Sequence, residues 1–215
     1  SILNFQKPCR VLYNTVESGK ILTGASDAAP ELVDDGAIRL AAVGTLKEPK
    51  GYMRLLSIVK RLRNEKYPIH LYILGIGPLR QEMERYIQTN SLQDSVTLLG
   101  YQTNPYKYVA KCDLFVCASF AEGFSTAATE ALIVGTPVCT VEVSGMKEML
   151  GENNEWGIVT ENSEETLYQG IKDLLDHPEK LAHYKEKAIE RGKIFSTENT
   201  VRAVEEMLLE LTNPR

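Results

Sequence analysis

The sequence lacks the long apolar runs of a membrane-spanning protein and the clustered cysteines or histidines of a metal or disulfide framework. No apolar run approaches the roughly 18 residues that a membrane span needs, and no signal peptide is visible. The four cysteines include no Cys-x-x-Cys pair, and the three histidines are scattered. We therefore expect a reducing, cytoplasmic compartment, buried free thiols at Cys117 and Cys139, and no bound metal. Any membrane contact would be peripheral.

An excess of basic residues is also missing, since the net charge of −5 argues against a nucleic-acid partner. The hydrophobic share of 43% is ordinary for a globular protein, and 215 residues suffice for one sizeable domain. Basic residues nevertheless crowd one stretch. Two interpretations stay open: a solvated helix face, which we favour, and a group of which one or two members reach an anionic ligand. The stretch contains Lys47, Lys50, Arg54, Lys60, Arg61, Arg63 and Lys66.

From residue 38 onward, short apolar segments alternate with segments whose apolar residues recur at helical spacing. The predicted strands cover residues 38–44, 69–75, 96–100, 114–119, 137–143 and 157–160. The predicted helices cover residues 51–66, 78–89, 104–110, 125–134, 164–175, 178–192 and 197–211. Strands that are apolar throughout and separated by helices indicate a parallel sheet covered on both faces. This pattern predicts an α/β fold, a Rossmann-like doubly wound sheet of about six strands.

The two ends of the chain differ from this alternating region. Residues 1–37 are interpreted as an amino-terminal tail or connector, in which Arg10 to Tyr13 is a candidate strand and residues 17–36 have little periodicity. The ligand-binding domain is expected to span residues 38–193. Residues 194–215 are predicted to form a carboxy-terminal helix.

A doubly wound sheet binds its ligands beyond the carboxyl ends of its strands, so the loops after the first four strands are the candidates for chemistry. The first loop runs from Gly44 through Thr45 to Lys50 and Gly51. Glycines allow the backbone to approach a ligand closely, and a lysine at the mouth of a site neutralises phosphate charge. An ordinary surface turn explains the same residues about equally well.

The next two loops are less specific. Gly75 and Gly77 resemble the start of a dinucleotide fingerprint, but Arg80 stands where its third glycine belongs. After the third strand, Tyr101 and Tyr106 either frame a nucleobase or serve in packing, and the sequence favours neither.

The fourth loop carries the strongest signal because it leads into a helix with an acid on each side of the helix start. The first amides of that helix are predicted to point at an anion. Glu130 lies more than a turn into the helix, badly placed for phosphate but well placed to accept hydrogen bonds from a ribose diol. Glu122 precedes the helix, where a donated sugar would lie. Either acid alone is also explained as an ordinary helix-start residue.

Together these segments resemble the carboxy-terminal domain of the large retaining glycosyltransferase family with the two-domain GT-B fold, family 4 or group 1. The match runs from Ile38 to Lys193, with a fainter match at residues 10–17 to the end of the family's amino-terminal domain. Its most specific element is the spacing of Glu122 and Glu130 within EGFSTAATEALIVGTPV. Gly-x-Gly-Pro-Leu from Gly75 and the Lys50-Gly51 pair stand in the expected order.

The resemblance implies a role for each matched residue. Lys50 would bind the diphosphate, Glu122 the hydroxyls of the transferred sugar, and Glu130 the ribose. Residues 123–126 would offer backbone or hydroxyl groups to the phosphates and sugar, and residues near Tyr101 would meet the base. The implied donor site comprises Gly44, Thr45, Lys50, Gly75, Gly77, Gly100, Tyr101, Tyr106, Glu122, Gly123, Phe124, Ser125, Thr126 and Glu130, of which Lys50 and Glu122 are also catalytic.

Two departures from the family pattern matter. The family usually has an arginine between the glycine and leucine of the first loop, and Thr45 stands there in this chain. An arginine fork suits a diphosphate well, so compensation by another basic residue such as Lys47 is expected if donor binding is strong. The chain also has almost none of the amino-terminal domain. It is therefore expected to be one domain of a longer protein, or half of a split enzyme, that alone binds donor weakly and transfers nothing.

The implied activity is transfer of a sugar from a nucleoside-diphosphate sugar, with a uridine nucleotide favoured, to a glycan or lipid-linked acceptor. The implied setting is surface polysaccharide biosynthesis in the cytoplasm or at the inner face of the cell membrane. No cofactor or metal is expected, since Lys50 and the helix start would stabilise the leaving diphosphate. A nicotinamide-dependent dehydrogenase is disfavoured because Arg80 replaces the third glycine and no acid ends the next strand. The remaining alternative is a non-catalytic binding or assembly module that supports a partner subunit.

Overall fold

The computed structural model describes residues 12–13, 15–33 and 35–212. Cys9, together with Arg10 and Val11 of the candidate strand, lies outside these ranges, and the described part of that candidate strand, Leu12 and Tyr13, is not in a strand. Within the described part of the chain, no helix combines the length and apolar character needed to cross a bilayer.

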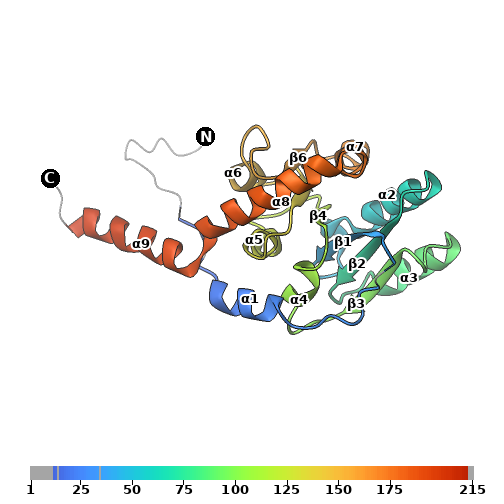
Figure 1. The fold of residues 1–215 in the computed structure, drawn as a ribbon, viewed down its shortest axis with the longest axis horizontal. Helices are drawn as coiled ribbons and strands as arrows, with labels where there is room; N and C mark the ends of the chain where they lie inside the picture. The colour runs from blue at the N-terminus through green and yellow to red at the C-terminus, as the bar shows by residue number, and fades with distance from the viewer. Residues whose placement is uncertain (1–11, 14, 34, 213–215) are drawn as a thin grey trace.

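The six predicted strands form one parallel sheet in the order β3-β2-β1-β4-β5-β6 (Figure 1). They are β1 (Ile38–Val43), β2 (Ile69–Leu74), β3 (Val96–Gly100), β4 (Leu114–Cys117), β5 (Val138–Val141) and β6 (Ile158–Thr160). Strands β1, β2 and β3 follow one another toward one edge of the sheet, and β4 then pairs with the other side of β1. This order confirms the prediction of a Rossmann-like doubly wound sheet.

Helices cover both faces of the sheet because alternate strand residues point to opposite faces. Leu40 and Ala42 of β1 belong to one core, whereas Ala41 between them belongs to the other. The first core includes residues of α2 (Tyr52–Asn64), α3 (Arg80–Thr89) and α7 (Glu164–Asp176). The second includes residues of α4 (Tyr106–Val109), α5 (Thr126–Ile133), α6 (Met146–Leu150) and α8 (Pro178–Gly192).

The connector contains a helix that the sequence analysis missed. Helix α1 (Ser18–Ala25) packs beside α4 (Figure 1), although its sequence has two glycines and no acidic first turn. Its start is held by tertiary contacts, because the Ser18 amide donates to Thr197 Oγ1 at 3.1 Å and the Thr197 amide donates to Ser18 Oγ at 3.0 Å. Ile21 is buried. The weak periodicity of residues 17–36 therefore does not predict α1, since long-range contacts stabilise this helix.

Other differences concern short or terminal elements. The five-residue helix α6 is too short to show helical periodicity, and it forms because Met146, Met149 and Leu150 are buried. Helix α3 begins at Arg80 rather than at Pro78, which lies in the preceding turn. The predicted carboxy-terminal helix is α9 (Thr197–Thr212), which extends away from the sheet (Figure 1).

The thiols Cys112, Cys117 and Cys139 are free and buried, as predicted for Cys117 and Cys139.

Candidate functional site

The predicted site loops meet at the point where the sheet reverses direction. Strands β1 and β4 are neighbours, but the helix after β1 covers one face and the helix after β4 covers the other. A crevice therefore opens between their carboxyl ends, the usual ligand position in such sheets. A small hollow there is lined by Lys50, Tyr52, Cys117, Ser119 and Glu122.

Lys50 and Glu122, 72 residues apart in the sequence, form an ion pair in this hollow. Lys50 Nζ lies 2.5 Å from Glu122 Oε1, and the Ser119 hydroxyl donates to the same oxygen at 2.8 Å. The lysine side chain is 32% exposed and the glutamate side chain 12% exposed, so the pair lies at the mouth of the crevice. The two charges offer a cation for a ligand phosphate and a carboxylate for a ligand hydroxyl within one small site.

Gly51 allows this ion pair to form. It has a φ of +66° and starts α2 directly after Lys50. A Cβ at this position would lie 1.9 Å from the carbonyl oxygen of Ala118, so a side chain cannot be accommodated. The glycine thus brings the Lys50 turn against the loop that carries Glu122.

Tyr52 forms the floor of the hollow and was not singled out from the sequence. Its side chain is 3% exposed, and its hydroxyl would lie 3.1 Å from a Cβ placed on Gly44. Burial, followed by the neighbouring Cys117 and Glu122 side chains, raises the pKa of the Tyr52 phenol. The phenol therefore stays neutral and carries its proton at physiological pH. In the sequence, Tyr52 looks like any residue of an apolar helix face. Only the fold shows that it lines the candidate site.

Glu130 belongs to a separate part of the site. The hydroxyl of Tyr106, in α4, donates to Glu130 Oε1 at 3.3 Å. Burial raises the pKa of the Glu130 carboxyl, and the hydrogen bond from Tyr106 partly opposes that effect. The structure therefore separates the two acids: Glu122 pairs with Lys50, whereas Glu130 accepts a hydrogen bond from the Tyr106 phenol.

Replacing Glu130 with glutamine is expected to raise the melting temperature at about pH 8 and to leave it unchanged at low pH. The raised pKa means that the folded protein binds this proton more tightly than the unfolded chain does. The carboxyl contribution to stability is therefore complete below the ordinary value of 4.5 and is lost as the pH rises through the raised pKa. Glutamine does not titrate, so its contribution to stability does not fall as the pH rises. Melting curves of both proteins across this range, with the exposed Glu161→Gln as control, test the prediction, and a pH-independent difference would contradict it.

At the start of α5, some residues cap the helix or pack against neighbours, and others are exposed. The buried hydroxyl of Ser125 accepts the amide hydrogen of Ala128 at 3.3 Å and so caps the helix. The ring of Phe124 packs against Tyr13, with 5.5 Å between ring centroids. Gly123 and Thr126 are exposed. Of the four residues predicted to contact phosphates and sugar, Phe124 and Ser125 thus take part in packing and capping, and Gly123 and Thr126 face solvent.

A pocket of about 400 Å³ lies next to this site, above the ends of β1, β2 and β3. Its lining includes Gly44, Thr45, Gly75 and Tyr101, and Tyr101 is 70% exposed. These residues come from three of the four predicted loops, so the structure brings them together. An exposed aromatic ring at the rim of such a pocket can stack on a planar ligand.

Gly75 and Gly77 serve loop packing in this pocket wall. A Cβ on Gly75 would lie 1.9 Å from the carbonyl oxygen of Gly44, and one on Gly77 would lie 2.4 Å from that of Leu46. The pair thus lets two loops touch backbone to backbone. The structure thus gives these two glycines a role in loop contact that needs no dinucleotide fingerprint.

The basic stretch divides into residues of different roles. Lys50 reaches the site, and Lys47 is exposed. Arg54 is only 6% exposed, so the interpretation of a solvated helix face is wrong for this residue. Its hydrogen bonds go to the loop between β4 and α5.

Comparison with known proteins agrees with this geometry. The family model described as "Glycosyl transferases group 1" matches residues 26–191. A 4-alpha-N-acetylgalactosaminyltransferase of Campylobacter jejuni, which by its name acts on N-acetylgalactosamine-N,N'-diacetylbacillosaminyl-diphospho-undecaprenol, is 34% identical over 208 residues, or 94% of this chain and 54% of that protein. An uncharacterized glycosyltransferase of Methanocaldococcus jannaschii is 33% identical over 165 residues, covering 69% of this chain and 40% of that protein.

Solved structures share the fold. Anabaena HepE in complex with UDP superposes with a TM-score of 0.80 at 19% identity, over 94% of this chain and 57% of that one. A glycosyltransferase from Rickettsia africae gives a TM-score of 0.80 at 18% identity, over 96% and 58% of the two chains. The present chain spans about half the length of the relatives it matches. With its sheet order, its convergent loops and a family match over most of its length, the chain belongs to the group 1 glycosyl transferases.

Proposed function

We propose that this chain is the donor-binding half of a retaining glycosyltransferase. The observation that carries the proposal is the convergence of Lys50, Glu122 and the start of α5 at the reversal point of the sheet. A cation and the start of a helix suit a diphosphate, and the carboxylate beside them suits sugar hydroxyls. A nucleoside-diphosphate sugar is the ligand class that presents both groups next to each other.

The rest of the site accommodates the nucleoside. Glu130 would accept hydrogen bonds from the ribose diol, with Tyr106 holding its carboxylate in place. The pocket of about 400 Å³ beside it would take the base, with Tyr101 at its rim. UDP is the favoured nucleotide, and the shared fold with UDP-bound HepE supports this choice.

In the proposed reaction, the bond between the anomeric carbon and the diphosphate oxygen breaks, and its electron pair leaves with the nucleoside diphosphate. Lys50 and the start of α5 would stabilise the charge that develops on that oxygen. A bond to an acceptor hydroxyl forms on the same face of the sugar, and the hydroxyl proton is released. We propose that these groups of the protein stabilise the leaving group without a metal.

The acceptor is proposed to be a glycan or a lipid-linked glycan at the cytoplasmic face of a membrane, in surface polysaccharide biosynthesis. The name of the Campylobacter jejuni relative, which specifies an undecaprenol-linked acceptor, supports this choice. The relatives extend well beyond the part matched by this chain, and we place the acceptor site in that part. Transfer would therefore need both halves.

A non-catalytic assembly module is the second candidate, favoured by Thr45 in place of the family's arginine. Calorimetric titration of the chain with UDP, GDP and ADP separates the two. We expect UDP to bind with a Kd between about 1 μM and 1 mM, the range of typical substrate affinities, and the Glu130→Gln variant to bind more weakly. Absence of heat with all three nucleotides, from protein shown to be folded, would favour the assembly module.

A further inference from the structure

The loop of residues 118–122, between β4 and α5, carries Glu122 and is held in place from three directions. The amide of Phe120 donates to the carbonyl oxygen of Pro49 at 2.8 Å. Asn162 Nδ2, from the segment before α7, donates to the carbonyl oxygen of Phe120 at 3.2 Å. The third contact comes from α2. The position of this loop determines where the Glu122 carboxylate meets Lys50.

Arg54, in the first turn of α2, makes that third contact. Its Nη2 donates to the carbonyl oxygens of Ala118 and Ser119, at 3.1 Å for Ser119. Its Nη1 donates to Asn162 Oδ1 at 2.8 Å, and its guanidinium lies 4.2 Å from the ring centroid of Phe120. One side chain thus contacts the loop backbone, the ring on the loop and the asparagine that also holds the loop.

The environment of Arg54 is unusual for a buried charge. The side chain is 6% exposed, and its Nε is buried without a hydrogen-bond partner among the described residues. Its hydrogen-bond partners in the described ranges are carbonyl and amide oxygens. Such burial is costly compared with an apolar side chain of the same size. A guanidinium presents five donors in a fixed planar fork that spans separate acceptors, whereas a lysine ammonium is a compact charge with three donors on one atom.

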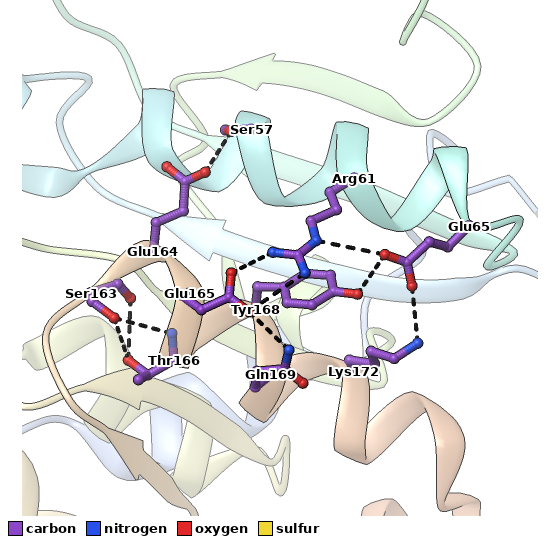
Figure 2. Close-up of polar contacts among 10 residues, drawn as sticks. All are labelled: Ser57, Arg61, Glu65, Ser163, Glu164, Glu165, Thr166, Tyr168, Gln169 and Lys172. Atoms are coloured by element: carbon purple, nitrogen blue, oxygen red, sulfur yellow. Dashed lines mark hydrogen bonds and ion pairs between the residues drawn. The ribbon is translucent and has the colours of Figure 1, made fainter.

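A polar network joins α7 to α2 (Figure 2), and Asn162 lies two residues before α7. Ser57 Oγ donates to a Glu164 oxygen at 2.6 Å, and Arg61 Nη1 lies 2.5 Å from Glu165 Oε2. Further along, Tyr168 donates its hydroxyl hydrogen to Glu65 at 2.6 Å. The network continues the line of contacts that begins with Arg54 and Asn162. Arg54 is thus bonded to a residue that closely precedes a helix packed on its own helix.

We propose that Arg54 is a positioning residue for the donor site: its fork holds loop 118–122 so that Glu122 and Lys50 meet at the sugar and phosphate of the donor. The inference rests on the proposed function. It identifies a second basic residue of the crowded stretch on which the site depends, acting through the loop rather than on the phosphates. Lys47, which is exposed, has no comparable contact with the loop in the described structure.

The test is a double-mutant cycle in the full-length protein with UDP-sugar as donor. Arg54→Met is expected to lower kcat by about 10- to 100-fold, since small misplacements of a positioning group have effects of this size. Because Arg54 acts through Glu122, adding Glu122→Gln should lower kcat little further. Multiplicative losses, or a kcat for Arg54→Met within twofold of wild type, would overturn the proposal. Arg63→Met, on the same helix but exposed and outside this network, is the matched control and should keep its kcat.

Two further variants guard against misfolding of Arg54→Met. Arg54→Lys keeps the charge but loses the fork, so it is expected to lose kcat in the same way, and a wild-type kcat would contradict a role for the fork. Asn162→Ala removes an exposed side chain that contacts both Arg54 and the loop, and it should give a smaller loss of the same kind. An unchanged kcat in this folded variant would count against the proposal.

Hydrogen exchange gives a readout that does not depend on activity. In Arg54→Lys, the amides of residues 119–123 should exchange faster, while those of β4 and α5 stay protected. Unchanged exchange in the loop would overturn the positioning role. If the unmodified full-length protein transfers no sugar, the proposed function fails, yet the exchange result still decides whether Arg54 holds the loop.

Discussion

Replacing Lys50 with methionine is expected to lower kcat of the full-length protein by about 100- to 1000-fold, the usual effect of removing one preorganised group that stabilises transition-state charge. Lys50 supplies the cation in the hollow between β1 and β4, 2.5 Å from Glu122. Methionine keeps the length of the side chain and removes only its charge. The loss should therefore appear in kcat more than in folding stability, and steady-state kinetics with thermal melting measure both.

Lys47→Met is the matched control for this prediction. Lys47 lies three residues earlier in the same loop and is exposed, so its loss should change kcat by less than about twofold, as for most surface substitutions. If Lys47→Met lost as much activity as Lys50→Met, the exposed lysine would compensate for the arginine that Thr45 replaces. A near-normal kcat for Lys50→Met would remove the central cation of the proposed mechanism.

The second large effect is expected for Glu122→Gln. A hydrogen bond to a charged group contributes about 1.5–3 kcal/mol, so loss of the carboxylate charge should lower kcat/KM for the UDP-sugar by about 10- to 150-fold. Affinity for UDP itself should change little, because UDP carries no transferred sugar for Glu122 to contact. Kinetics with the sugar nucleotide and calorimetry with UDP separate the two effects.

Glu130→Gln makes the same chemical change at the other acid, and we expect a different pattern of effects on the two ligands. Glu130 contacts Tyr106 rather than Lys50, and its proposed partner is the ribose. This variant should weaken UDP and UDP-sugar alike. If both acids gave the same pattern, the division of the site into a sugar side and a ribose side would be wrong.

The convergence of the candidate site residues was largely predictable because they occur in loops that a parallel sheet must bring to one edge. Lys50, Glu122 and Glu130 follow β1 and β4, and once the strands were placed their convergence followed from the fold class. Arg54 and Tyr52 were not predictable in the same way. Both lie in an ordinary amphipathic helix, where a sequence pattern does not distinguish a buried functional group from a surface or core residue.

The sequence by itself determined the alternation of strands and helices, the parallel sheet and the loops that carry the chemistry, because periodicity and glycine placement are local properties of the chain. Only the tertiary structure decided which charges meet and which helices exist without local support. Helix α1 depends on Ser18 meeting Thr197, and the Lys50–Glu122 pair depends on Gly51 fitting against Ala118. Such contacts join residues far apart in the sequence, and their geometry depends on the packing of the whole sheet.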